Sequence, residues 1–163
     1  MSTAGLLREV EAGLPPEFRE RFFSAESHAG IHLAVMREPF LSYLVAGLKT
    51  VESRFSVNRV DPFDRIKSGD LVLLKAGAVV GAFIVDDVDC RLLPPGGISA
   101  VRQEFGSEIM ADDDFWALKQ DARFATLLTV GEIFDFSPFE VSKRDMRGWV
   151  VLRAADRELL TIW

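Results

Sequence analysis

Residues 47–54 read GLKTVESR, at the junction of a predicted helix and a predicted strand. Gly47 follows a helix-forming segment, 38–46, at the position where a helix C-cap requires a positive φ. The next residues alternate in polarity, which predicts a half-buried strand over 50–57. One face of that strand would carry Val51, Ser53 and Phe55, and the other Glu52, Arg54 and Ser56.

Downstream of this junction, the segment 61–88 has the pattern of a hairpin. Ser68-Gly69-Asp70 predicts a turn that opens a short apolar strand over 71–74. Ala76-Gly77 can then close a tight turn into a longer strand over 79–88. Tight turns of this kind favour antiparallel pairing.

The remaining elements surround that hairpin. Expected helices are two short ones over 3–25, broken at Pro15-Pro16, then 98–105 and 112–120. Expected strands are 31–36, 124–136 and 149–153, with Ser137-Pro138 ending the second and a basic turn, 143–148, preceding the third. This order predicts an α+β fold, a small β-barrel with flanking helices and an N-terminal helical extension. The expected organisation is the extension, 1–28, followed by one domain, 29–163.

Composition places the chain among single-domain globular proteins of a reducing compartment. It has 163 residues, of which 48% are hydrophobic and 27% charged. No apolar run approaches the roughly 20 residues of a membrane span, and the N-terminus does not resemble a secretory signal. The lone Cys90 cannot form an internal disulfide. We therefore expect a cytoplasmic protein without membrane association.

Charge is distributed unevenly along the chain. The net charge is −6, whereas proteins that coat nucleic acid are usually basic. Residues 49–75 nevertheless carry +2 and residues 143–153 carry +3, while nine acidic and three basic residues give −6 between 86 and 121. A local positive surface is therefore compatible with the overall sign. The three aspartates at 112–114 suit a helix N-cap, with a metal site as the lesser alternative.

The segment 39–75 resembles the ASCH family, part of the PUA-like superfamily. The resemblance is carried by Gly47, Lys49, Glu52 and Arg54 in a Gly-x-Lys-x-x-Glu-x-Arg pattern, followed by Gly69-Asp70 and an apolar strand. It continues more weakly through residue 153. The resemblance implies a PUA-like barrel with a cleft at the Gly-x-Lys motif, and a role in binding RNA or modified nucleotides.

The residue types at this motif suit such a ligand. Glu52 can accept from the exocyclic amine of a base, Arg54 can clamp a phosphate or stack, and Trp149 can stack on an unpaired base. The expected ligand-binding residues are Lys49, Glu52, Arg54, Arg59, Lys75, Arg144, Arg147 and Trp149. The alternatives are a surface ion-pair ladder for the motif, a core position for Trp149 and a solvated loop for 143–147.

An enzymatic role is a second hypothesis. The resemblance extends to small amidohydrolases acting on N4-acyl cytidines, which use a Lys, a Thr and a Glu. Here Lys49 matches, but Glu52 occupies the Thr position and Ile84 falls near the Glu position, so Asp86 or Asp87 would need a register shift. A different hydrolase, or a ribonuclease, would use Lys49 and Glu52 as its catalytic candidates.

Other functions have less support in the sequence. No spacing of His and Cys residues suggests a metal site, and no glycine-rich nucleotide loop suggests a cofactor, so neither is expected. His28 and His32 form no pair suited to ribose cleavage. The N-terminal helices offer a third hypothesis, a surface for a protein partner.

Overall fold

The computed structural model describes residues 2–156. Its helices are α1 (Thr3–Gly13), α2 (Pro16–Phe22), α3 (Phe40–Val45), α4 (Ile98–Ile109) and α5 (Asp113–Leu118). Its strands are β1 (Ile31–Val35), β2 (Val51–Ser56), β3 (Leu71–Ala76), β4 (Ala78–Leu92), β5 (Phe124–Phe139) and β6 (Trp149–Arg153). This order is the predicted one. Within the described residues, no helix is long and apolar enough to span a membrane.

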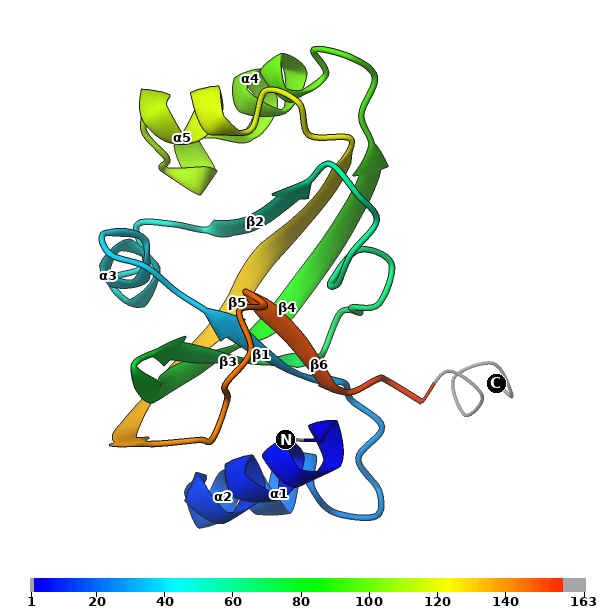
Figure 1. Cartoon of the computed structure of the whole chain (residues 1–163). Coiled ribbons are helices and arrows are strands. Elements are labelled where there is room, and N and C mark those ends of the chain that lie inside the picture. The colour runs from blue at the N-terminus through cyan, green and yellow to red at the C-terminus, as the bar shows by residue number, and fades with distance from the viewer. Residues whose placement is uncertain (1, 157–163) are drawn as a thin grey trace.

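The strands form one curled sheet, which resembles a barrel left open along one side (Figure 1). Its order is β2-β5-β4-β3-β1-β6, so β2 and β6 are the two edges. All pairs are antiparallel except β1 with β3. The predicted α+β fold, a small and incompletely closed barrel with flanking helices, is therefore confirmed.

The two longest strands, β4 and β5, give the sheet its curvature. Their pairing contains three register shifts, between Val79 and Gly81, Phe83 and Val85, and Val85 and Asp87. Such bulges bend a strand and increase its twist. Two positions beside these bulges require glycine. A Cβ at Gly81 would lie 2.6 Å from the carbonyl oxygen of Phe134, and a Cβ at Gly131 would lie 2.6 Å from the carbonyl oxygen of Ile84.

The prediction that Ser137-Pro138 ends its strand is wrong, because β5 continues to Phe139. Proline has no backbone N–H, so it weakens a sheet only at a position where another residue would have donated its N–H to the neighbouring strand. Here the pairing partners jump from Asp135 to Phe139, so Pro138 lies in a bulge opposite β4. On its other side β2 pairs only as far as Thr129. The missing N–H therefore interrupts no hydrogen bond.

The N-terminal helices cover one face of the sheet (Figure 1). Their apolar stripe is buried against β1, β3 and β6, and consists of Leu6, Val10, Leu14, Phe18 and Phe22. Phe18 also meets Phe134 of β5 edge-on, at 4.7 Å between ring centroids. Burial of each such aromatic contributes about 1.5–3 kcal/mol. The apolar face of this segment is thus already covered, although the boundary at residue 28 stays a prediction.

At the opposite end, α4 and α5 pack on the outer face of β2 and β5 (Figure 1). Both helices lie in the connection between β4 and β5, and their buried side chains include Val101, Ile109 and Trp116. Asp112 caps α5, since its side chain accepts from the Phe115 N–H at 2.8 Å. The acidic cluster at 112–114 therefore includes the expected capping residue.

Three buried polar side chains connect β6, β1 and the start of β3. The Trp149 indole N–H donates to His32 Nδ1 at 3.0 Å, and His32 Nε2 lies 2.9 Å from Asp70. Because an indole can only donate, Nδ1 must accept, and the imidazole hydrogen is on Nε2 and points to Asp70. Asp70 also accepts the backbone N–H groups of Gly30 and Lys67. Asp70, the second residue of the Gly-Asp motif, therefore holds three segments together.

Replacing Trp149 with Phe should destabilise the protein by more than packing alone explains. The substitution leaves His32 Nδ1 buried without a donor, which costs about 1–3 kcal/mol. Urea unfolding checks this, with Trp116→Phe as the matched control, since Trp116 is equally buried at 4% exposed but no hydrogen bond of its indole occurs within the described residues. An equal loss of unfolding free energy in both variants would contradict the role of the hydrogen bond.

Candidate ligand-binding pocket

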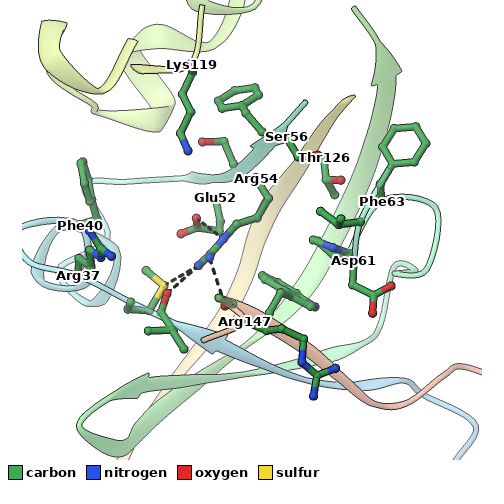
Figure 2. A pocket seen from close by; sticks show the side chains of 18 of the residues that line it. Arg37, Phe40, Glu52, Arg54, Ser56, Asp61, Phe63, Lys119, Thr126 and Arg147 are labelled. Carbon is green, nitrogen blue, oxygen red and sulfur yellow. Dashed lines mark hydrogen bonds and ion pairs between the residues drawn. The ribbon is translucent and has the colours of Figure 1, made fainter. Parts of the chain in front are cut away.

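A pocket of about 620 Å³ opens where the barrel is incomplete, between β2 and the β1–β6 edge. This volume lies within the range of small-molecule sites, about 300–1,000 Å³. α3, α5 and the loops 60–63 and 143–148 contribute further walls, and Figure 2 shows many of the side chains that line the pocket. Lys49, Glu52 and Arg54 of the Gly-x-Lys motif therefore line a pocket.

Lys49 is buried at the pocket wall, with 3% of its surface exposed. The bend before it is made by Gly47, which adopts φ +76° as expected for a helix C-cap. Its ammonium donates to the Ile109 carbonyl at 2.7 Å and lies 5.6 Å from the centre of the Phe40 ring. Burial lowers the pKa of Lys49, an effect that the charge of Glu52 opposes and that of Arg54 reinforces.

Glu52 and Arg54 lie side by side on the inner face of β2, as the alternation predicted. Arg54 Nε lies 3.4 Å from Glu52 Oε1, close enough for charge attraction. Arg54 Nε and Glu52 Oε2 are nevertheless buried without a hydrogen-bond partner. A buried polar atom without a partner costs about 1–3 kcal/mol. The pair thus has a buried donor and a buried acceptor that the protein itself leaves without a hydrogen bond.

The terminal nitrogens of Arg54 reach across the opening of the barrel (Figure 2). Nη2 donates to the Val35 carbonyl at 3.1 Å, and Nη1 to the Gly148 carbonyl at 3.4 Å. Val35 ends β1 and Gly148 precedes β6, so one side chain from the first edge of the sheet binds the backbone near the other edge. Arg54 therefore spans the opening of the pocket and also contributes a positive charge to its lining.

Trp149 lines the pocket but is only 4% exposed. The Arg54 guanidinium lies over its ring, 5.1 Å from the ring centre. Trp149 is thus both the core residue and the pocket residue that the sequence left as alternatives. A planar ligand meets Arg54, itself a good stacking partner, before it meets the indole.

The other predicted residues divide into two groups. Lys75 and Arg147 line the pocket, whereas Arg59 and Arg144 are exposed and do not. Arg59 instead pairs with Asp64 at 2.9 Å. Arg147 is bound to Asp145 at 2.8 Å, which makes the 143–147 segment an internally paired loop.

Several lining residues were missed by the sequence analysis. They include Arg37, Phe40, Phe115, Lys119, Thr126 and Lys143. Thr126 was predictable in principle, because it lies opposite Arg54 in the β2–β5 pairing and shares its face. Arg37 and Lys119 gave no local signal, since only the tertiary fold brings their segments to the pocket.

The pocket is strongly positive although the chain is negative. Seven basic residues line it, namely Arg37, Lys49, Arg54, Lys75, Lys119, Lys143 and Arg147. Only three acidic residues, Glu52, Asp61 and Asp145, accompany them, an excess of four positive charges. None of the nine acidic residues between 86 and 121 lines the pocket. The acidic side chains of this segment therefore lie outside the pocket, and the pocket suits an anion.

The amidohydrolase arrangement is not reproduced by the neighbouring residues. Asp86 and Asp87 are exposed and do not line the pocket, so neither supplies the Glu of that pattern. His32 is bound to Asp70 and Trp149, and likewise does not line it. Among residues 2–156, no three His, Cys, Asp or Glu side chains are grouped to hold a metal ion.

The fold is similar to solved structures of ASCH proteins. The crystal structure of ASCH from Zymomonas mobilis matches with a TM-score of 0.60 at 13% identity, over 81% of this chain and 92% of that chain. A serine-to-alanine variant of the Zymomonas mobilis protein matches with a TM-score of 0.61 at 13% identity, over 83% of this chain and 96% of that chain. A tyrosine-to-phenylalanine variant of the same protein matches with a TM-score of 0.59 at 13% identity, over 81% of this chain and 96% of that chain.

The comparisons of sequence are negative. No protein-family model matches the chain, and no curated protein matches it. The structural matches therefore carry the assignment: the chain has an ASCH-like fold, as its Gly-x-Lys and Gly-Asp motifs predicted.

Lys49 should make the unfolding free energy rise with pH. Its pKa is lowered in the folded state, so between that value and the unfolded value of about 10.4 the unfolded chain binds more protons. Raising the pH through this window therefore favours the folded state. The urea midpoint of the native chain should rise between about pH 7 and about pH 10, and it should rise more than the midpoint of Lys49→Met does over the same range. Parallel pH dependence in the two proteins would contradict a buried, titrating amine.

Proposed function

We propose that the protein binds RNA or a modified nucleotide in this pocket. The observation that carries the proposal is the excess of four positive charges, concentrated at one pocket of a chain whose net charge is −6. A uniformly basic surface binds phosphate anywhere, whereas a single positive pocket binds it in one place.

The other walls of the pocket support a nucleotide rather than a simple anion. Five aromatic residues line it, namely Phe40, Phe55, Phe63, Phe115 and Trp149. The Arg54 guanidinium presents a flat surface on which an unpaired base can stack. Beside it, the unpartnered Glu52 Oε2 suits the exocyclic amine of a base. Charge, flat surfaces and a hydrogen-bond acceptor together match the parts of a nucleotide.

Single-stranded RNA should bind in a salt-dependent manner, and Lys49→Met should weaken binding by roughly tenfold or more. The ammonium has three donors and uses one on Ile109, so it can add charge-assisted hydrogen bonds to a ligand. A fluorescence titration with labelled single-stranded and hairpin RNA at two salt concentrations measures this. Arg8→Ala is the control, because Arg8 is exposed on α1 and does not line the pocket.

Two results of that titration would overturn the proposal for RNA. One is no binding to either RNA at low salt. The other is salt-dependent binding that Lys49→Met and Arg8→Ala reduce equally, because this would locate the binding outside the pocket.

A hydrolase acting on N4-acyl cytidine-type nucleosides is the second candidate. It is favoured by one observation: a buried lysine whose pKa is lowered lies three residues from a buried carboxylate with a free oxygen. In that chemistry Glu52 is the general base that activates water, and Lys49 stabilises the developing negative charge. Water adds to the amide carbon, and the free acid and cytidine leave.

Incubation with an N4-acyl cytidine tests this activity. Chromatography should detect cytidine and the free acid, and Glu52→Gln should reduce the rate by about a hundredfold or more. Arg8→Ala serves again as the control. Absence of cytidine from the native protein, or an unchanged rate in Glu52→Gln, excludes the proposed chemistry.

A further inference from the structure

Four basic side chains at the pocket form no ion pair within residues 2–156: Arg37, Lys49, Lys75 and Lys119. All three acidic lining residues are matched: Glu52 with Arg54, Asp61 with Arg65 and Asp145 with Arg147. Arg37 and Lys119, by contrast, make no ion pair or side-chain hydrogen bond within the described residues. Lys119 has only the face of the Phe115 ring, 5.6 Å from its ammonium. Their charge is therefore not neutralised by the protein.

These two cations come together with Arg54 from three separate elements. Arg37 lies between β1 and α3, Lys119 caps the C-terminus of α5, and Arg54 lies on β2. In Figure 2 the Lys119 side chain extends from α5 toward the pocket that Arg37 and Arg54 also line. The pKa of Lys119 is lowered, first by burial and then by the positive charges of Arg54 and Arg37. Arg54 and Arg37 are therefore each near enough to Lys119 to repel its positive charge.

Three neighbouring positive charges that share a single carboxylate, Glu52, repel one another, and a bound anion relieves that repulsion. We propose that Arg37 and Lys119, with Arg54, form a phosphate subsite that holds the phosphate group of a nucleotide. This inference rests on the proposed function and assigns the position of the ligand in the pocket. The ligand class is a nucleoside phosphate, either the monoester of a free nucleotide or a phosphodiester within an RNA strand.

The opposite side of the pocket is less suited to this role. Lys143 and Arg147 both bind Asp145, at 3.1 and 2.8 Å, so that carboxylate already neutralises part of their charge. The phosphate accordingly lies on the α3–α5 side. Arg54 is shared between the two parts of the ligand, since Glu52, the acceptor assigned to the base, lies beside it on β2.

The test compares nucleosides with nucleotides in the Arg37→Ala/Lys119→Ala protein. Isothermal titration would use the four ribonucleosides and their 5′-monophosphates at low salt. In the native protein we expect the monophosphate to bind roughly tenfold or more tightly than its nucleoside, as charge-assisted contacts imply. In the double variant this difference should disappear while nucleoside affinity stays the same. Arg8→Ala/Lys67→Ala, which removes the same charges outside the pocket, should keep the difference.

A second arm identifies the source of the phosphate. A short single-stranded RNA without terminal phosphates carries only phosphodiesters. If the double variant binds this RNA more weakly than the native protein does, a phosphate within the strand occupies the subsite. If the double variant loses affinity only for the nucleoside monophosphates, a terminal phosphate occupies the subsite. Either result supports the subsite.

Three outcomes overturn the inference. Equal binding of nucleosides and monophosphates to the native protein removes the phosphate subsite but leaves the proposed function intact. An equal effect of the control double variant shows a general charge effect instead. No binding of any nucleoside, nucleotide or RNA overturns both the subsite and the proposed function.

Discussion

The contact of Arg54 with the backbone at Val35 and Gly148 joins the two edges of an incomplete barrel. A sheet whose first and last strands do not pair has two exposed edges, which proteins generally protect. Here one guanidinium binds a carbonyl on each side of the β1–β6 junction and lies over Trp149. The same side chain thereby limits the opening and lines the pocket, so the geometry of the pocket depends on the contact that holds the edges.

This contact also explains why two distant sequence motifs occur together. Asp70 of the Gly-Asp motif binds His32, His32 accepts from Trp149, and Trp149 supports Arg54 of the Gly-x-Lys motif. The chain of contacts runs from the buried start of β3 to the surface of the pocket. The position of an arginine that lines the pocket therefore depends on an aspartate that does not line it.

The sequence was sufficient for the fold and for part of the site. Alternation on β2 placed Glu52 and Arg54 on one face, and Gly47 marked the turn, because these are local effects of backbone geometry. Pro138 was misread, since a proline is tolerated where a bulge leaves its nitrogen unpaired, and that depends on pairing with a distant strand. Arg37 and Lys119 were missed for a similar reason: neither belongs to a motif, and only the packing of α3 and α5 places them at the pocket.

The location of α4 and α5 has a consequence for how the protein can diversify. Both helices lie within one connection between β4 and β5, whose long ladder does not depend on their hydrogen bonds. This insert nevertheless supplies Phe115 and Lys119 to the pocket wall. Loops that carry function on a rigid scaffold tolerate change more readily than the scaffold does. Replacement of this one segment would therefore change the wall of the pocket while the sheet and the Arg54 contact with the backbone of Val35 and Gly148 stay in place.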